Sequence, residues 1–99
     1  MNKMVMVMVA KPGKTREAIA AVKAMVEYVN TKHDLKTVAY MQIMGGTTGT
    51  IYVIGEDKDA ASAQAASAKV MTDEGYWALS QKLAEVIINP PTMSFLQPL

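Results

Sequence analysis

Apolar residues recur along the chain with two different periods, which separate predicted strands from predicted helices. Residues 4–9 alternate methionine and valine and are followed by Lys11-Pro12-Gly13, which predicts a strand that is apolar on both faces. From Thr15 to Val29 apolar residues recur every three or four positions, which predicts an amphipathic helix. We expect Thr15 to cap this helix and the helix to end within residues 30–34.

The middle of the chain is typical of a β-hairpin. Residues 35–44 and 50–54 have strand composition, and the glycines of 45–49 lie between them. Glycine supplies the positive φ angles that a tight hairpin loop requires. We therefore predict two antiparallel strands joined by this loop.

Two more helices and a last strand are predicted after the hairpin. Asp59 is a plausible N-cap for an alanine-rich helix over 60–71, and the acidic residues at 72–74 favour a second helix start. That second helix must end before Pro90-Pro91, because the residue before a proline is disfavoured in the α region. Residues 92–96 then predict a final strand.

The resulting order is strand, helix, strand, strand, broken helix, strand. This βαββαβ order predicts an α+β, ferredoxin-like domain over residues 1–99, with a four-stranded antiparallel sheet and the helices on one face. In that arrangement the first and third strands are central, and here they are also the most apolar. The outer strands carry polar residues, as edge strands tend to.

Both faces of the predicted sheet are apolar. Alternation gives one set of residues, which we assign to the helices because it is uniformly apolar: Val5, Val7, Val9, Ala39, Met41, Ile43, Ile51, Val53, Met93 and Phe95. The other set is expected on the uncovered face: Met4, Met6, Met8, Val38, Tyr40, Gln42, Met44, Tyr52, Ile54 and Leu96. An uncovered antiparallel face is normally polar, and an apolar one of about 300 Å² marks an interaction site. We therefore predict a homodimer or higher oligomer packed sheet to sheet, with Met4, Met6, Met8 and Met44 at the seam.

Composition narrows the classes of function. The chain has 99 residues, a formal charge of +1, 51% hydrophobic residues and no cysteine. No thiolate metal site or cysteine nucleophile is therefore available, and near-neutral charge argues against a nucleic-acid partner. The apolar run at the start is too short for a secretory leader, and no stretch is long enough to span a membrane, so we expect a cytoplasmic protein with no membrane partner.

A few polar and aromatic side chains stand among the apolar ones. Tyr40, Gln42 and Tyr52 are expected on the uncovered face, where they either orient a small ligand or pair across a dimer seam. His33, the sole histidine, is expected in a solvated turn. No residue receives a catalytic role from its spacing, and no metal site is expected.

The chain resembles the dimeric α/β barrel superfamily in three places: Lys11-Pro12-Gly13-Lys14, Gly45-Gly46 and Asp73-Glu74-Gly75-Tyr76-Trp77. That superfamily includes antibiotic-biosynthesis-type monooxygenases, NIPSNAP-like proteins and muconolactone-isomerase-like enzymes. The resemblance implies homodimerisation through the sheets and, in some members, a small organic ligand between sheet and helices. By the same resemblance Tyr76 and Trp77 are ligand-binding candidates, although each is also a plausible buried anchor for its helix. Haem binding in the manner of haem-degrading members is not expected, because no histidine follows His33.

Two hypotheses of function follow. The first is a homodimer that binds a small aromatic or apolar molecule, and whose reaction, if it has one, is of the monooxygenase-like or isomerase-like kind and uses no metal or flavin. The second is a non-catalytic structural or regulatory dimer whose assembly is the function. A cavity of a few hundred Å³ reached by tyrosine hydroxyls would favour the first.

Overall fold

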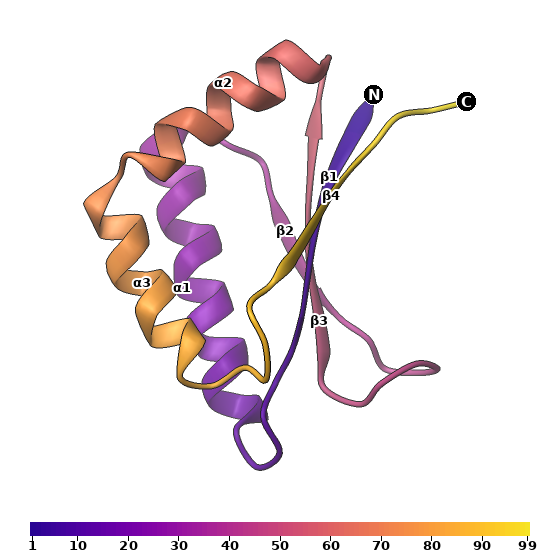
Figure 1. Cartoon of the computed structure of the whole chain (residues 1–99), viewed down its shortest axis with the longest axis vertical. Coiled ribbons are helices and arrows are strands. Elements are labelled where there is room, and N and C mark those ends of the chain that lie inside the picture. Colours follow the sequence, from indigo (N-terminus) through magenta and orange to yellow (C-terminus); the bar gives the residue numbers. More distant parts are fainter.

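One antiparallel sheet and three helices make up the protein. The computed structural model describes residues 1–99. In chain order its elements are β1 (Asn2–Val9), α1 (Thr15–His33), β2 (Val38–Met41), β3 (Thr50–Asp57), α2 (Ala60–Met71), α3 (Glu74–Ala84) and β4 (Thr92–Leu96). The strands lie in the order β2-β3-β1-β4, and all pairs are antiparallel. Figure 1 places the three helices on one face of the sheet and leaves the other face uncovered. The predicted ferredoxin-like fold is therefore confirmed.

Helices α2 and α3 begin where the sequence predicts, each after an aspartate that caps it. The carboxylate of Asp59 accepts a hydrogen bond from the Ser62 amide at 2.8 Å, and Asp73 accepts from the Gly75 amide at 2.8 Å. Asp59 thus satisfies one free N–H group of a first helical turn, and Asp73 satisfies two, since it also accepts from the Tyr76 amide. For α1 the prediction is wrong by one residue. Lys14 precedes the helix without a side-chain cap, and its carbonyl accepts the first helical hydrogen bond.

Two predicted elements are longer than the observed ones, and neighbouring backbone explains both. Strand β2 begins only at Val38 because the Asn30 side chain holds Thr37 by three hydrogen bonds, to its amide, carbonyl and hydroxyl. Helix α3 ends at Ala84, because the next residues bond to the end of β1. The Ile88 amide donates to the Val9 carbonyl at 2.9 Å.

The faces of β1 are the reverse of the prediction. Met6 is paired directly with Val53 on one side and with Met93 on the other, so all three lie on the same face. That face packs against the helices, where Met6 and Met8 are buried and Met4 is partly buried. The assignment of Met4, Met6 and Met8 to a dimer face is therefore wrong. The valines of β1 occupy the uncovered face in their place.

Alternation alone could not choose between the two faces of β1, since both of its residue sets are apolar. A neighbouring charge does distinguish them. Lys3 shares a face with Val5 and Val7, and its ammonium pairs with the Glu56 carboxylate at 2.8 Å in solvent. A lysine beneath three helices would have no such exit to water, so this residue was the signal for the correct register.

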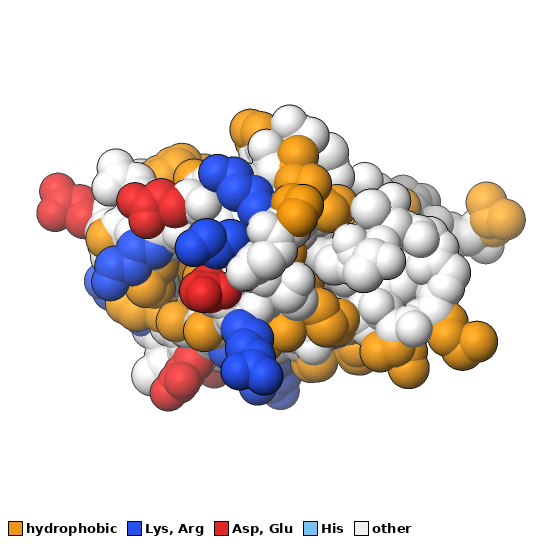
Figure 2. All heavy atoms as spheres, turned by 90° about the horizontal axis from the view of Figure 1, so that it is seen from below, with side chains coloured by type: hydrophobic (Ala, Val, Ile, Leu, Met, Phe, Trp, Pro, Cys, Tyr) orange, Lys and Arg blue, Asp and Glu red, His pale blue; other side chains and the backbone are white.

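The uncovered sheet surface, here called the open face, is largely apolar, as predicted. Its apolar and aromatic residues are Val5, Val7, Val9, Val38, Tyr40, Tyr52, Ile54 and Leu96, and it also carries Lys3, Thr50, Glu56, Thr92 and Ser94. Of these, Tyr40 and Leu96 have 52% and 53% of their surface exposed. Seen from below in Figure 2, charged side chains gather over the helical side, whereas the opposite side, where the β2–β3 loop projects, shows hydrophobic and uncharged groups. No helix here combines the length and hydropathy that a bilayer crossing requires.

Candidate functional site

A cavity of about 470 Å³ lies between the sheet and the helices. Hydrophobic residues make up 17 of the 25 that line it. Six of the nine methionines are among them: Met4, Met6, Met8, Met25, Met71 and Met93. Flexible, polarisable thioethers adapt to the shape of a bound molecule and make favourable contacts with aromatic rings. The volume is in the range of sites that hold small organic molecules.

Small residues create this space. Helix α2 buries only Val70, and the side chains that it turns toward the cavity include Ala63 and Ala66. On the sheet, Gly55 stands opposite Met4 and leaves that position of the floor without a side chain. A helix with larger apolar residues would have filled the gap with core.

The polar edge of the cavity is formed by Lys36 and Asp57, neither of which is buried, and Glu56 also borders it although its carboxylate pairs with Lys3 on the open face. Between α2 and β4 the cavity is lined by apolar side chains that are partly exposed to solvent. Met71, Met93 and Phe95 are 40%, 51% and 41% exposed. Strand β4 lies at the sheet edge, and residues Met93 and Phe95 on its helix side are left partly uncovered. The cavity is therefore open to solvent between α2 and β4.

Tyr76 is the one tyrosine that lines the cavity. Its residue surface is 7% exposed, yet its hydroxyl makes no hydrogen bond within the protein and is not sealed from solvent. Burial raises the pKa of the Tyr76 hydroxyl above its ordinary value of 10. At neutral pH this side chain is therefore a neutral hydrogen-bond donor without a partner in the protein, on a residue that lines an apolar cavity.

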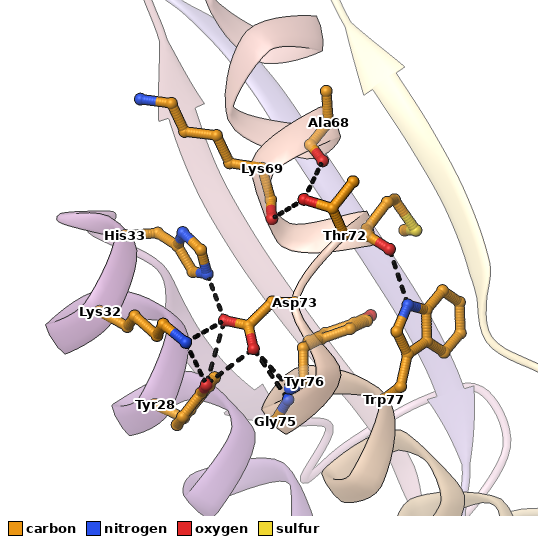
Figure 3. A network of polar contacts seen from close by, with 11 residues as sticks. Tyr28, Lys32, His33, Ala68, Lys69, Thr72, Asp73, Gly75, Tyr76 and Trp77 are labelled. Atoms are coloured by element: carbon orange, nitrogen blue, oxygen red, sulfur yellow. Dashed lines mark hydrogen bonds and ion pairs between the residues drawn. The ribbon is translucent and has the colours of Figure 1, made fainter.

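Beside Tyr76, four side chains form what is here called the Asp73 cluster: Tyr28, Lys32, His33 and Asp73 (Figure 3). The first three come from the last turns of α1, and Asp73 caps α3. The Tyr28 hydroxyl lies 2.8 and 3.0 Å from the two Asp73 oxygens, and His33 Nε2 lies 2.7 Å from Oδ2. Lys32 Nζ lies 3.3 Å from the same oxygen. The cluster therefore joins the end of α1 to the start of α3.

The Asp73 carboxylate stays ionised in this setting. Burial by itself would raise the pKa of Asp73, but hydrogen bonds from Tyr28, His33 and Lys32 hold it well below its usual range. An ionised carboxylate only accepts hydrogen bonds, so His33 Nε2 must carry the proton. The pKa of Lys32 is raised in turn, first by its hydrogen bond to the Tyr28 hydroxyl and then by Asp73.

Sequence reasoning missed most of this cluster. His33 was expected in a solvated turn, but it ends α1 and its side chain is only 11% exposed. Its partner follows 40 positions later, and only the packing of α1 on α3 brings them together. Tyr28 belongs to the same α1 turns as Lys32 and His33, and this proximity was the available signal.

Trp77 does not line the cavity, and its side chain binds the end of α2. Its indole N–H donates to the Met71 carbonyl at 2.7 Å, and 46% of the residue is exposed. The ring meets Tyr76 edge to face, with centroids 5.5 Å apart. In this arrangement Trp77 fixes the last turn of α2 relative to α3.

The other predicted site residues lie on the far side of the sheet from Tyr76. Tyr40 and Tyr52 are paired across β2 and β3 on the open face, and the Tyr52 hydroxyl donates to Gln42 Oε1 at 2.8 Å. None of the three lines the cavity. Met44 is 85% exposed in the loop between β2 and β3, which projects away from the helices in Figure 1. The predicted set is thus divided between two faces.

Comparisons with known proteins support the fold. A NIPSNAP domain protein from Burkholderia xenovorans superposes with a TM-score of 0.83 at 15% identity, over 100% of this chain and 95% of that chain. A putative antibiotic biosynthesis monooxygenase from Nitrosomonas europaea gives 0.74 at 13% identity, over 100% and 99% of the two chains. A NIPSNAP family protein from Agrobacterium tumefaciens gives 0.76 at 14% identity, over 99% and 92%.

The chain therefore has the fold shared by NIPSNAP domain proteins and antibiotic-biosynthesis-monooxygenase-like proteins, which confirms the resemblance drawn from the sequence. No family model and no curated protein matches the sequence. At these identities the likeness concerns the fold, and one fold hosts many activities.

Proposed function

We propose that this protein binds a small, neutral, largely apolar molecule with one hydrogen-bonding group, in the cavity between its sheet and helices. The observation that carries the proposal is a methionine-lined cavity of about 470 Å³ whose wall includes Tyr76, a residue with no hydrogen-bond partner for its hydroxyl in the protein. An apolar site with a few polar groups that set orientation is the usual form of a small-molecule site.

Charge supports a neutral ligand. The ionisable groups on the cavity other than Tyr76, namely Lys36, Glu56 and Asp57, lie at its unburied edge. Glu56 is already paired with Lys3. A charge carried inward would lose its hydration without gaining a partner. Tyr76 is neutral at pH 7, since its pKa is ordinarily 10 and burial raises it further, and in this proposal it donates a hydrogen bond to the bound molecule.

The open face supports a second part of the proposal, that two copies pack sheet to sheet. The non-catalytic alternative, in which the dimer itself is the function, has this same face as its support. The binding proposal and the structural alternative differ in what they imply for the cavity, since only the binding proposal gives it a role. Oxygenase or isomerase chemistry, the kinds of activity found among proteins of this fold, would act on the molecule held beside Tyr76.

Binding of 2-naphthol, an apolar bicycle with one hydroxyl, tests the proposal. We expect saturable binding in equilibrium dialysis, and tighter binding than for naphthalene, which lacks the hydroxyl. The variant Tyr76→Phe removes one neutral hydrogen bond, so 2-naphthol should bind about 3- to 10-fold more weakly and naphthalene should be unaffected.

Tyr40→Phe is the matched control, because it makes the same chemical change on the open face. It should leave both affinities as in the natural protein. If the natural protein binds neither 2-naphthol nor naphthalene saturably, the structural alternative is favoured. Equal losses in Tyr76→Phe and Tyr40→Phe would contradict the assignment of the site to the cavity.

A further inference from the structure

The first turn of α3 is held from several sides at once. Asp73 accepts hydrogen bonds from the Gly75 amide at 2.8 Å and the Tyr76 amide at 3.4 Å. From α1 it also accepts those of Tyr28 and His33. The carboxylate that caps the helix is thus the same one that anchors it to α1. Figure 3 shows the Tyr76 ring directed away from this cluster.

The backbone of Tyr76 is therefore placed by groups that do not touch the cavity. Neither Tyr28 nor His33 lines it. A tyrosine has only two side-chain torsions, so where its hydroxyl lies depends closely on where its backbone is fixed. A shift of the helix start would carry the hydroxyl with it.

Gly75 allows the approach that this anchoring needs. A Cβ at position 75 would collide with the Tyr28 hydroxyl and ring. The φ of Gly75 is not in the positive region, so its backbone shape does not require glycine. Glycine is needed here because Tyr28 lies so close to the first turn of α3 that no side chain fits between them.

We propose that Tyr28, acting with His33 through Asp73, is a positioning residue for Tyr76 and thereby sets the preference of the cavity for molecules that carry a hydrogen-bonding group. This inference rests on the proposed binding function. It assigns a role in specificity to residues that lie outside the cavity.

The variant Tyr28→Phe keeps the ring and removes the hydroxyl that bonds Asp73. We expect 2-naphthol to bind about 2- to 5-fold more weakly, whereas naphthalene binds as before, because naphthalene makes no use of the Tyr76 hydroxyl. A purely structural loss would weaken both probes alike. The variant His33→Gln, which alters the second anchor, should change the ratio of the two affinities in the same direction.

Tyr52→Phe serves as the matched control. It also removes a hydroxyl that bonds another side chain, but on the open face, and the ratio of affinities should not change. Circular dichroism and thermal unfolding establish that each variant is folded at the assay temperature.

A double-mutant cycle completes the test. In the Tyr76→Phe background, Tyr28→Phe should have no further effect on 2-naphthol, because the group that it positions is gone. If Tyr76→Phe abolishes the preference for 2-naphthol and neither Tyr28→Phe nor His33→Gln alters it, the positioning role is wrong while the proposed function stands. Equal weakening of both probes, or independent effects in the cycle, would also overturn the positioning role. If neither probe binds the natural protein, both proposals are wrong.

Discussion

At the scale of single residues, Asp73 accepts hydrogen bonds from more groups than any other side chain in the structure. It bonds two side chains of α1 and two amides of α3, and it also pairs with Lys32. Each bond is made to the ionised form, and together they hold the pKa of Asp73 below its ordinary value of 3.8. A group whose pKa is lower in the folded state stabilises that state only while it is ionised.

This depression of the pKa predicts a loss of stability in acid. The contribution of Asp73 is complete above pH 3.8, its ordinary value, and decreases as the pH falls toward the lower folded value. Asp73→Asn should therefore lower the free energy of unfolding at pH 7, and the difference from the natural protein should shrink below pH 4. Urea unfolding at pH 7 and pH 3 measures this.

Asp34→Asn is the control for that experiment. Asp34 follows α1 with a left-handed backbone, which asparagine also adopts readily, and its side chain makes none of the hydrogen bonds found at Asp73. Its effect should be small and similar at both pH values. A difference for Asp73→Asn that does not shrink in acid would contradict the ionised carboxylate.

At the scale of elements, α2 covers part of the cavity, but its small side chains do not fill the space beneath it. It buries Val70 alone among its residues, and Trp77 holds its last turn by an indole hydrogen bond to the Met71 carbonyl. Alanine is the best helix former, so the segment stays helical although it contributes little apolar contact. Such an element leaves room beneath it for a bound molecule.

Filling that room should exclude a ligand. Ala66→Leu places a larger side chain on the cavity wall and should weaken 2-naphthol binding by about tenfold or more, since the two then compete for one volume. Ala65→Leu makes the same change at an exposed neighbour that does not line the cavity. That variant should bind as the natural protein does. Equal effects of the two, measured by equilibrium dialysis, would place the ligand elsewhere.

At the scale of the whole molecule, the sheet is apolar on both faces and the helices cover one. Solvent reaches the open face at Val38, Tyr40 and Leu96, which are 49%, 52% and 53% exposed. Contiguous apolar surface of this kind on soluble proteins marks places where another molecule binds. A second copy offers a matching surface through a two-fold axis.

Val7→Lys tests this assembly. Val7 lies on a central strand of the open face, between Tyr52 and Thr92, and a lysine there would bury an unpaired charge in the seam. We expect the natural protein to sediment as a dimer and Val7→Lys to sediment as a monomer. Ala20→Lys adds the same charge at an exposed position of α1 and should leave the dimer intact. A dimer that persists in Val7→Lys would contradict sheet-to-sheet packing.

Local patterns in the sequence determined the order of the elements, the two capped helix starts and the glycine loop, because periodicity, capping and turn chemistry act between near neighbours. They also determined that both sheet faces are apolar. Which face of β1 meets the helices was decided by cross-strand pairing, since Met6 and Val7 both belong to apolar sets. The meeting of Tyr28 and His33 with Asp73, and the space beneath α2, likewise depend on how helices pack. Contacts between residues 40 or more positions apart leave no periodic or local signal in the sequence. Only the tertiary structure could therefore place Tyr76 at a cavity and bring Tyr28 and His33 to Asp73 beside it.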